Sequence, residues 1–456
     1  MPASDPLCDF DPAVRTRALR ALAGAAPPAA APRGGGARVR ANLHLHTFHS
    51  YNCQNWSPAR AVCEAWREGW AAVGIADFDT LAGLEETFEA ADLLGVRAAV
   101  SLETRVFWPA YADRVVNSPG EPGVAYLGLA GFAARPAAGS RARAALDSLS
   151  AGAEARTRLI AARVNAALPE IAVDYDRDAR PLTPSGNVTE RHLLAAYDAR
   201  ARGVFGGGMG AGGALAAFWG RVLGLPAPEA AGLLPDPGAF RNAARAKLMK
   251  RGGPGYIAPE PGAFPPLAEA VELARGAGAL PCAMWLDGQS AGEADAEAYF
   301  GDCQDAGLRA ACFIPDRNWN VPDPARRKAN LAALARAVEA ARSRGFLLIS
   351  GTEMNSPGQR TSDDPGRPEL APYLSDFLEG AYALHGHSLL SRARGWGIGG
   401  AWAAGAFGRD RRGENAFFGA VGRHPPPDPG RRRRLAALPD RGAPEDALAV
   451  LGAPPD

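Results

Sequence analysis

Short apolar runs alternate with helical patterns in two separate parts of the chain. The apolar runs predict strands, and they cover residues 39–45, 71–76, 97–102, 279–286, 309–314 and 346–350. Residues at helical spacing lie between these runs and predict helices over residues 57–69, 81–95, 266–276, 294–306 and 324–344. Because strict alternation of strand and helix is typical of parallel β/α units, the pattern predicts an α/β fold.

The alternation is interrupted in the middle of the chain. Helical patterns separated by Gly and Pro, with no clear strand between them, cover residues 138–166, 190–202, 213–223 and 237–251. They indicate a mainly helical insertion over about residues 135–265. A further helical pattern, over residues 368–390, follows the last predicted strand.

The two ends of the chain differ in composition from the part between them. Residues 1–37 combine a short predicted helix with an Ala/Pro/Gly stretch that cannot pack a core, which predicts a flexible linker. Residues 38–395 carry the strand and helix pattern. Residues 396–456 become rich in Pro and Arg, and we expect this C-terminal extension to be partly disordered.

The composition limits the classes of partner. The 456 residues include 50 Lys and Arg against 49 Asp and Glu, a net charge of +1, so the whole chain gives no electrostatic reason to expect nucleic acid or a membrane surface. The six cysteines are scattered without close pairs, as in a reducing compartment. The sequence shows neither a secretory signal nor an apolar run of about 18 residues. We therefore expect a cytoplasmic protein, and the sequence leaves its oligomeric state open.

Two histidines at the end of the first predicted strand form the clearest candidate site. His44 and His46 are two residues apart, so both side chains project from the same face of a strand. Two imidazoles in this arrangement can grip one cation. His49 follows the strand, and we expect it to be a loop residue.

Carboxylates follow the next two predicted strands. Asp77 and Asp79 can coordinate a metal or accept a proton, and Asp79 is also a candidate cap for the following helix. Glu103 follows the third strand, and Arg105 can hold this carboxylate or an anionic substrate. In a barrel, the ends of the strands are where active sites are assembled.

Together these motifs resemble the PHP (polymerase and histidinol phosphatase) domain superfamily. The stretch from Asn42 to Glu103 resembles the N-terminal half of such domains, with a His-x-His strand, a Ser-Pro-opened helix and strand ends that carry Asp and Glu. Later parts of the family pattern are resembled by residues 160–196, 278–286 and 350–355. The resemblance covers about residues 38–390 and implies an α/β fold, a distorted (β/α)7 TIM-like barrel with a mainly helical insertion.

The chain departs from the family at several ligand positions. The family usually holds three divalent metals, and five of the expected ligand positions are occupied here by Tyr51, Phe78, Ala125, Met284 and Asn355. The family ligands that share a single metal are matched by His44, His46, Glu103 and Glu353. The resemblance therefore implies a reduced centre that holds one divalent metal ion, Zn or Mn, or none.

The resemblance implies a metal-dependent hydrolase of phosphoesterase type that acts on a small phosphorylated molecule. We expect the catalytic residues to be Asp77, His192 and Arg317, with Asp77 or His192 as the proton shuttle. We expect the substrate to be bound by Arg105, Arg191, Asp316, Asn318 and Asn355. The sequence shows no separate nucleic-acid module.

Two other interpretations stay open. Apolar residues at former ligand positions also fit a catalytically inactive barrel that binds a ligand or a partner. Amide and aromatic side chains near the expected mouth also fit a hydrolase for a neutral substrate such as a sugar. His385 and His387 resemble a metal pair only superficially, and we expect both to be structural.

Overall fold

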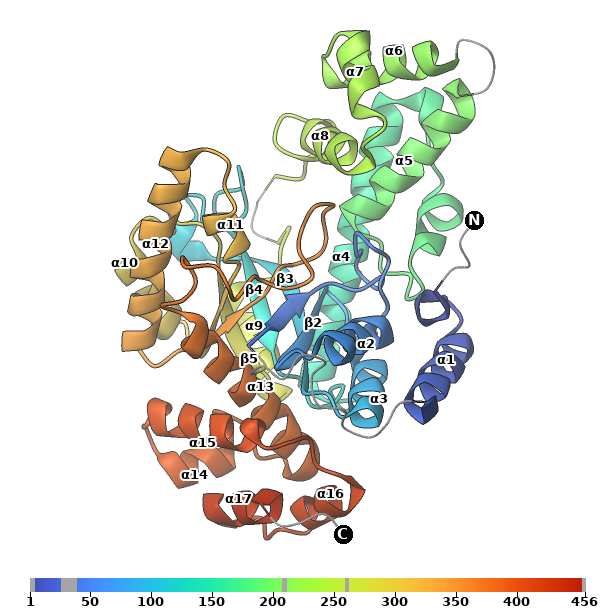
Figure 1. The fold of residues 1–456 in the computed structure, drawn as a ribbon. Coiled ribbons are helices and arrows are strands. Elements are labelled where there is room, and N and C mark those ends of the chain that lie inside the picture. The colour runs from blue at the N-terminus through green and yellow to red at the C-terminus, as the bar shows by residue number, and fades with distance from the viewer. Residues whose placement is uncertain (1–4, 26–38, 207–210, 259–261, 453–456) are drawn as a thin grey trace.

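Seven strands form one sheet in the order of the sequence (Figure 1). The computed structural model describes residues 5–25, 39–206, 211–258 and 262–452. The strands are β1 (Ala41–Leu45), β2 (Ala72–Phe78), β3 (Ala98–Phe107), β4 (Val124–Ala130), β5 (Leu280–Trp285), β6 (Ala310–Phe313) and β7 (Leu347–Ser350). Neighbouring strands are parallel, except that β4 is antiparallel to both β3 and β5.

Residues just beyond β7 close the sheet into a barrel. Glu353 bridges Leu45 in parallel: its N–H donates to the carbonyl of His44 at 2.8 Å, and its carbonyl accepts from the N–H of His46 at 2.8 Å. Gly351 permits this approach, because a Cβ there would lie 2.3 Å from the Cβ of His44. The closed seven-stranded α/β barrel confirms the predicted fold class.

Helices flank the strands of the barrel. They are α2 (Pro58–Glu68), α3 (Leu84–Leu94), α9 (Leu267–Gly276), α10 (Ala296–Asp305) and α12 (Pro324–Ser343). The local sequence explains the ends of α2: the Ser57 side chain accepts from the N–H of Arg60, and Pro58 takes a position where no backbone donor is needed. Gly69 then ends the helix in the left-handed conformation, with φ of 64°.

Two elements differ from the sequence prediction. β4 lies where the pattern predicts no strand, because nearly all of its residues are buried and the run lacks the alternation of a half-buried strand. α3 begins at Leu84 rather than at residue 81, and its N-cap, Gly83, has no side-chain cap. Asp79 does not cap this helix; its Oδ1 accepts from the hydroxyl of Thr104 at 2.7 Å.

The helical insertion lies over one end of the barrel (Figure 1). Its helices are α4 (Arg141–Ala167), α5 (Glu190–Phe205), α6 (Ala211–Leu223), α7 (Ala227–Leu233) and α8 (Pro237–Met249), and short helical turns cover Pro169–Ile171, Tyr175–Ala179 and Arg180–Leu182. The insertion has a hydrophobic core of its own, which includes Tyr197, Trp219 and Phe240. The side chain of Asn187 donates to the carbonyl of Phe78 at 2.7 Å, so the insertion covers the end at which the parallel strands finish.

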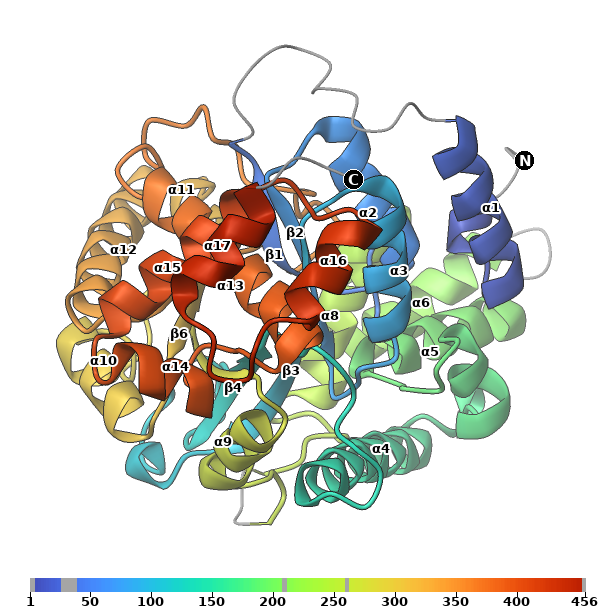
Figure 2. The same ribbon diagram turned by 90° about the horizontal axis from the view of Figure 1, so that it is seen from below.

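The C-terminal helices cover the opposite end of the barrel (Figure 2). They are α13 (Leu374–Arg394), α14 (Ala401–Phe407), α15 (Arg411–Arg423), α16 (Pro429–Ala436) and α17 (Pro444–Gly452). The expected partial disorder of the C-terminal extension is therefore wrong for its described residues. The reason is that Phe418, Val421 and Leu435 join one hydrophobic core with Leu43 and Met284 of the strands.

The N-terminal segment packs on the side of the barrel. α1 (Pro12–Ala25) is held against α3 by an ion pair of 2.6 Å between Arg15 and Glu86, and a short 3-10 turn (Pro6–Cys8) precedes it. Most of the predicted linker lies outside the described residues.

Short helices also cover Pro109–Tyr111 and α11 (Asp316–Trp319). In the part of the chain that the structure describes, we find no helix with the length and apolarity needed to cross a membrane.

Candidate active site

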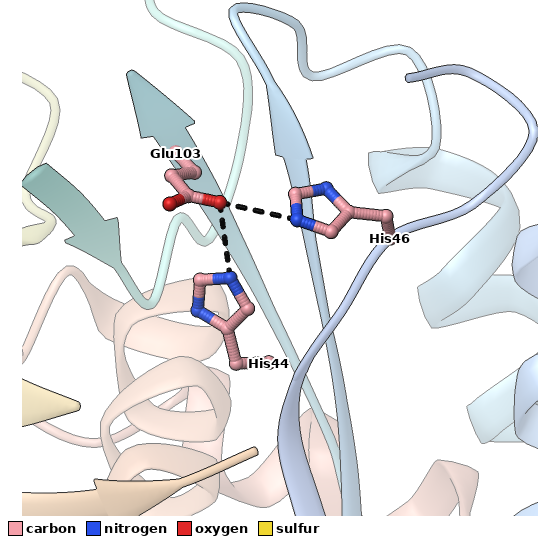
Figure 3. A group of neighbouring side chains, drawn as sticks. All are labelled: His44, His46 and Glu103. Carbon is pink, nitrogen blue, oxygen red and sulfur yellow. Dashed lines mark hydrogen bonds and ion pairs between the residues drawn. The ribbon is translucent and has the colours of Figure 1, made fainter. Parts of the chain in front are cut away.

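Three buried side chains meet at the finishing end of the strands (Figure 3). His44 lies on β1, His46 directly after it, and Glu103 on β3. The Nε2 atoms of both histidines lie 3.1 Å from Oε2 of Glu103. The three residues are exposed by only 3, 0 and 4 %. Their ligand atoms lie within 4.8 Å of one another, and among the described residues this is the one group of the kind that holds metal ions.

A chain of hydrogen bonds fixes the tautomer of His46. The carboxylate of Asp77 accepts from the N–H and the hydroxyl of Thr47 and from the hydroxyl of Ser50, each at 2.7 Å. Because the one hydroxyl proton of Ser50 goes to Asp77, its oxygen accepts from Nδ1–H of His46 at 3.1 Å. A neutral His46 therefore presents the lone pair of Nε2 to Glu103. In this tautomer no hydrogen lies between Nε2 and the Glu103 oxygen 3.1 Å away, so the two facing acceptors require a cation or an added proton.

The charges of the cluster also suit a cation. Burial alone would lower the pKa of His44, but Glu103 and Glu353 outweigh burial and raise it above the usual value. Burial would raise the pKa of Glu103, yet the two histidines lower it to about 2. The cluster by itself thus gathers a proton. Two imidazoles and one carboxylate, all buried, are a donor set that fits a divalent cation such as Zn²⁺ or Mn²⁺.

The fourth predicted ligand, Glu353, turns its carboxylate to other groups. Nη2 of Arg317 lies 3.1 and 3.2 Å from its two oxygens, and Asn355 donates to it at 3.3 Å. Although burial would raise the pKa of Glu353, Arg317 holds it below its usual value, so the carboxylate is charged. Glu353 and Met354 both have left-handed backbone, with φ of 65° and 53°, which is strained for residues other than glycine. The structure therefore brings three of the four predicted ligands together and places Glu353 beside them.

The two predicted proton shuttles are engaged elsewhere. Asp77 already accepts three hydrogen bonds and is 1 % exposed. The Nδ1 atom of His192 accepts from the N–H of Thr189 at 3.1 Å, where it helps to cap α5. Burial lowers the pKa of His192 to about 3, so its ring is neutral at physiological pH. The geometry gives Asp77 and His192 positioning roles.

Aromatic rings stand where the family resemblance expects further ligands. The ring of Phe78 stacks on His46 with centroids 4.4 Å apart and an angle of 18° between the planes. Tyr51 lies against His192 with a centroid distance of 5.4 Å. Met284 is buried in the core of the barrel. None of these three side chains offers a good ligand for a second cation.

A cavity of about 70 Å³ opens beside the three-residue cluster. Ser50 and Phe78 line this cavity, and each of them also contacts His46, so the two side chains lie between the cavity and the cluster. Its polar lining comes from the barrel and from three helices of the insertion: Asp79, Arg105, Tyr126, Arg156, Asn187, Thr189, Glu190, Arg191 and Arg245. Four arginines therefore converge on one small cavity, and two of them, Arg105 and Arg191, are predicted substrate ligands.

Positive charge is in excess around this cavity. Glu190 is held by Arg245 at 2.6 Å, by Lys250 at 3.1 Å and by Arg105 at 3.5 Å, and these cations outweigh burial and lower its pKa. Arg191, by contrast, bonds neutral amides, including that of Asn355 at 3.2 Å. Burial and the charge of Arg245 lower the pKa of Arg191 to about 10, so the side chain is still a cation at neutral pH.

The remaining carboxyl group of the cavity wall is Asp79. Burial raises its pKa, although Arg156 acts in the opposite sense. Its backbone is left-handed, with φ of 56°. The cavity thus combines an excess of guanidinium groups over carboxylates with a carboxyl group that burial pushes towards its neutral form, an arrangement that suits an anionic ligand.

The other predicted site residues lie on α11, away from the arginine cavity. The buried side chain of Asn318 donates to the carbonyls of Leu286 at 3.0 Å and Ile314 at 3.2 Å, so it shapes the turn after β6. Asp316 lies 3.6 Å from Arg360. Arg317 is the member of this segment that reaches the cluster, through Glu353.

Sequence reasoning missed Ser50, Arg156 and Arg245. Ser50 follows the His-x-His motif by four residues, and this spacing was a usable signal. Arg156 and Arg245 lie on helices of the insertion, where the sequence has no strand end to mark them and arginine is common. Only the packing of α4, α5 and α8 over the barrel brings them to the site.

No protein-family model matches the chain, and no curated protein matches it. Solved structures similar to it include an amidohydrolase from Chromobacterium violaceum with bound sulfate and no metal, at 19 % identity over 74 % of this chain and 95 % of that chain, with a TM-score of 0.47. Another is a protein from Bifidobacterium adolescentis provisionally named a metal-dependent phosphoesterase, at 17 % identity over 74 % of this chain and 96 % of that chain, with a TM-score of 0.44.

Proposed function

We propose that this protein is a metal-dependent hydrolase of phosphoesterase type that cleaves a small phosphorylated molecule at a single-metal centre. The observation that carries the proposal is the buried His44, His46 and Glu103 cluster beside an arginine-lined cavity. Three protein ligands leave room at a tetrahedral ion for water or substrate. Guanidinium groups bind phosphate oxygens through paired hydrogen bonds.

The chain's own residues would prepare the reaction. When bound, a divalent cation supplies Lewis acidity, which polarises a phosphoryl oxygen and makes water more acidic. Asp77 and Ser50 hold the His46 ring with its Nε2 lone pair towards Glu103. Arg191 and its neighbours orient the phosphate group from the cavity side, and the ring of Phe78 excludes water from one face of His46.

The leaving group of a phosphoester needs a proton. Asp79 lines the cavity, whereas Asp77 accepts from Thr47 and Ser50, and His192 accepts from the N–H of Thr189. We therefore assign the role of proton donor to Asp79 in place of the two residues that the sequence suggests.

A second candidate function is a barrel that binds a phosphorylated ligand without cleaving it. Arg317 pairs with Glu353, so a cation would have three protein ligands rather than four, and Phe78 stands where the resemblance expects a ligand of a second metal. A neutral sugar substrate fits less well, because it would leave the excess positive charge of the cavity, that of Arg191 above all, without counter-charge.

Elemental analysis of the purified protein separates the two candidates. The hydrolase should contain about one equivalent of Zn or Mn, which His46→Ala and the double variant His44→Ala/Glu353→Gln should lose. His424→Ala, which alters a histidine remote from the site on the C-terminal extension, should retain the metal and serves as the control. The wild type should also release phosphate from a panel of small phosphoesters.

Two results would contradict the hydrolase. Undiminished phosphate release by His46→Ala would show that the cluster is not the catalytic centre. Absence of metal from the wild type, even after reconstitution with Zn²⁺ or Mn²⁺, would leave the binding barrel as the better account.

A further inference from the structure

A second and larger cavity lies at the opposite end of the barrel, next to the chain between α13 and α14 and the start of α15. The C-terminal helices at this end are seen in Figure 2. The volume of the cavity is about 560 Å³. Its walls are the loop after β4, the segments that precede β5 and β6, and the chain between α13 and α14. Four arginines line the cavity, Arg135, Arg275, Arg309 and Arg411, and no acidic residue does so among the described residues.

The four guanidinium groups have only two carboxylate partners in the described chain. Arg309 pairs with Glu414, and Arg135 pairs with Glu85 at 2.8 Å. Arg275 donates to the carbonyl of Gly307 at 3.1 Å, which leaves its charge unbalanced. The cavity therefore keeps a net positive charge.

Arg411 has neither a carboxylate partner nor, at one of its nitrogens, a hydrogen-bond partner among the described residues. That nitrogen, Nη1, is buried. Burial and the nearby charge of Arg309 lower the pKa of Arg411, while Glu414 acts in the opposite sense. Because a buried donor without an acceptor destabilises the folded protein, this atom calls for an anionic partner from outside the chain.

One part of the cavity wall is rich in glycine and is anchored by a hydrogen bond. Gly395, Gly397, Gly399 and Gly400 lie along it, and without side chains they let a ligand approach the backbone. The N–H of Gly399 donates to Glu414 at 2.6 Å. This loop is thus anchored to α15, so the cavity is formed in advance rather than on binding.

We propose that this cavity is a second binding site, separate from the hydrolytic centre, for a small anion that carries phosphoryl groups. Paired donors on guanidinium match phosphoryl oxygens. The volume is in the range of small-molecule sites, about 300–1,000 Å³. A nucleic-acid polymer fits poorly, because the positive charge is confined to one cavity and the whole chain carries a net charge of only +1.

A bound anion would stabilise the lower end of the molecule. It would lie between the barrel segments that carry Arg275 and Arg309 and the C-terminal helix that carries Arg411. Since it binds only the folded chain, it should raise the melting temperature in proportion to the logarithm of its concentration.

Calorimetric titration with inorganic pyrophosphate and with ADP tests the proposal. It uses the full chain with His46→Ala and Arg191→Gln, so that the arginine-lined cavity of the candidate active site contributes little to binding. We expect binding of at least one probe, weakened about tenfold by adding Arg411→Gln and further by Arg275→Gln. Arg409→Gln, an exposed arginine of the same segment outside the cavity, should leave the affinity unchanged. Tighter binding of ADP would assign part of the cavity to an organic group, and equal affinity would assign the site to the phosphoryl anion alone.

Hydrogen exchange of the wild-type chain provides a second measurement that needs no variant. Pyrophosphate or ADP should slow exchange of the amides of residues 395–400. The proposal would be overturned if neither probe bound. It would also be overturned if the Arg411→Gln variant bound the probe with unchanged affinity, or if exchange in residues 395–400 stayed unchanged. The titrations do not depend on whether the candidate active site hydrolyses phosphoesters, because they use a chain that carries His46→Ala.

Discussion

At the scale of single residues, the metal-binding capacity of the site depends on a serine that would not touch the metal. The hydroxyl of Ser50 donates its one hydrogen bond to Asp77, and its oxygen must therefore accept from His46. Without it, the imidazole can adopt the other tautomer, in which Nε2 carries a proton and no lone pair faces Glu103.

Ser50→Ala should therefore weaken binding of Zn²⁺ by about 10- to 100-fold while the protein stays folded. Competition with a chromophoric chelator measures this affinity. Ser50→Thr, which keeps the hydroxyl, should restore most of it, and the exposed Ser148→Ala on α4 is the matched control. Wild-type affinity in Ser50→Ala would refute the tautomer argument.

The same scale shows what the sequence could and could not reveal. The two histidines of the site were predictable because residues two apart on a strand share a face. The role of Ser50 was not, since its spacing from the histidines marks the position but does not show that its hydroxyl donates to Asp77 and accepts from His46. The partner of Glu353 was not predictable either: its left-handed backbone, with φ of 65°, aims the carboxylate at Arg317, and no local pattern announces such a conformation for glutamate.

At the scale of elements, the closure between β1 and the segment after β7 positions the site. The backbone of Glu353 bonds to both His44 and His46, so any displacement of this segment also moves the two histidines. Gly351 makes the closure possible, because a Cβ at this position would overlap His44.

Gly351→Ala should lower the free energy of unfolding by about 1–3 kcal/mol or more, through overpacking at the seam. Urea unfolding followed by circular dichroism measures the loss. Gly203→Ala on α5, where a Cβ would meet nothing within 4 Å, should instead change stability little or raise it by about 0.4–1 kcal/mol. Equal stability of the two variants would contradict the tight seam.

A neutral histidine joins three elements at the other end of the barrel. Nε2 of His387, on α13, donates to the carbonyl of Gly131 after β4 at 2.9 Å, and its Nδ1 accepts from the N–H of Ile398 at 2.9 Å. Burial lowers the pKa of His387 from 6.5 to about 4. Its protonation would remove the acceptor for Ile398.

This depressed pKa predicts acid sensitivity with a definite sign. The unfolded chain binds the proton more readily than the folded one, so the contribution of His387 to stability is present above pH 6.5 and is lost as the pH falls from 6.5 towards 4. Urea unfolding at pH 8, 6 and 5, followed by tryptophan fluorescence, should show a flatter pH dependence for His387→Gln than for the wild type. His424→Gln should keep the wild-type dependence of stability on pH. An unaltered dependence in His387→Gln would show that the neutral form of His387 does not contribute to stability.

At the scale of the whole molecule, the barrel and its two helical additions are not equally predictable. Alternating strands and helices predicted parallel β/α units, since each parallel strand needs a crossover, and the resemblance of the motifs implied that these units form a barrel. The insertion was recognisable only as helical, because the sequence does not say how helices pack. The C-terminal extension was misjudged: its Arg and Pro content hides the few apolar residues, such as Phe418 and Leu435, that a shared core needs.

The C-terminal helices complete the core of the barrel rather than extending it. The backbones of α13 and α15 approach so closely that a Cβ at Gly386 would lie 2.1 Å from the carbonyl oxygen of Phe418, and one at Gly422 would lie 1.8 Å from that of Tyr382. Phe418 and Val421 are fully buried in the same core as Leu43 of β1. Removal of α15 would therefore expose the lower ends of the strands as well as one face of α13.

A chain that ends at Gly395 should not fold cooperatively, in spite of containing every strand and the complete candidate site. We expect it to aggregate or to bind a hydrophobic dye, with no sharp thermal transition, whereas a chain that ends at Gly452 should melt like the full-length protein. Gly386→Ala, which keeps all residues but separates α13 from α15, should shift the melting temperature in the same direction. A soluble chain ending at Gly395 with a wild-type transition would mean that the barrel closes its own core, and the lower cavity would then be a feature of an appended domain.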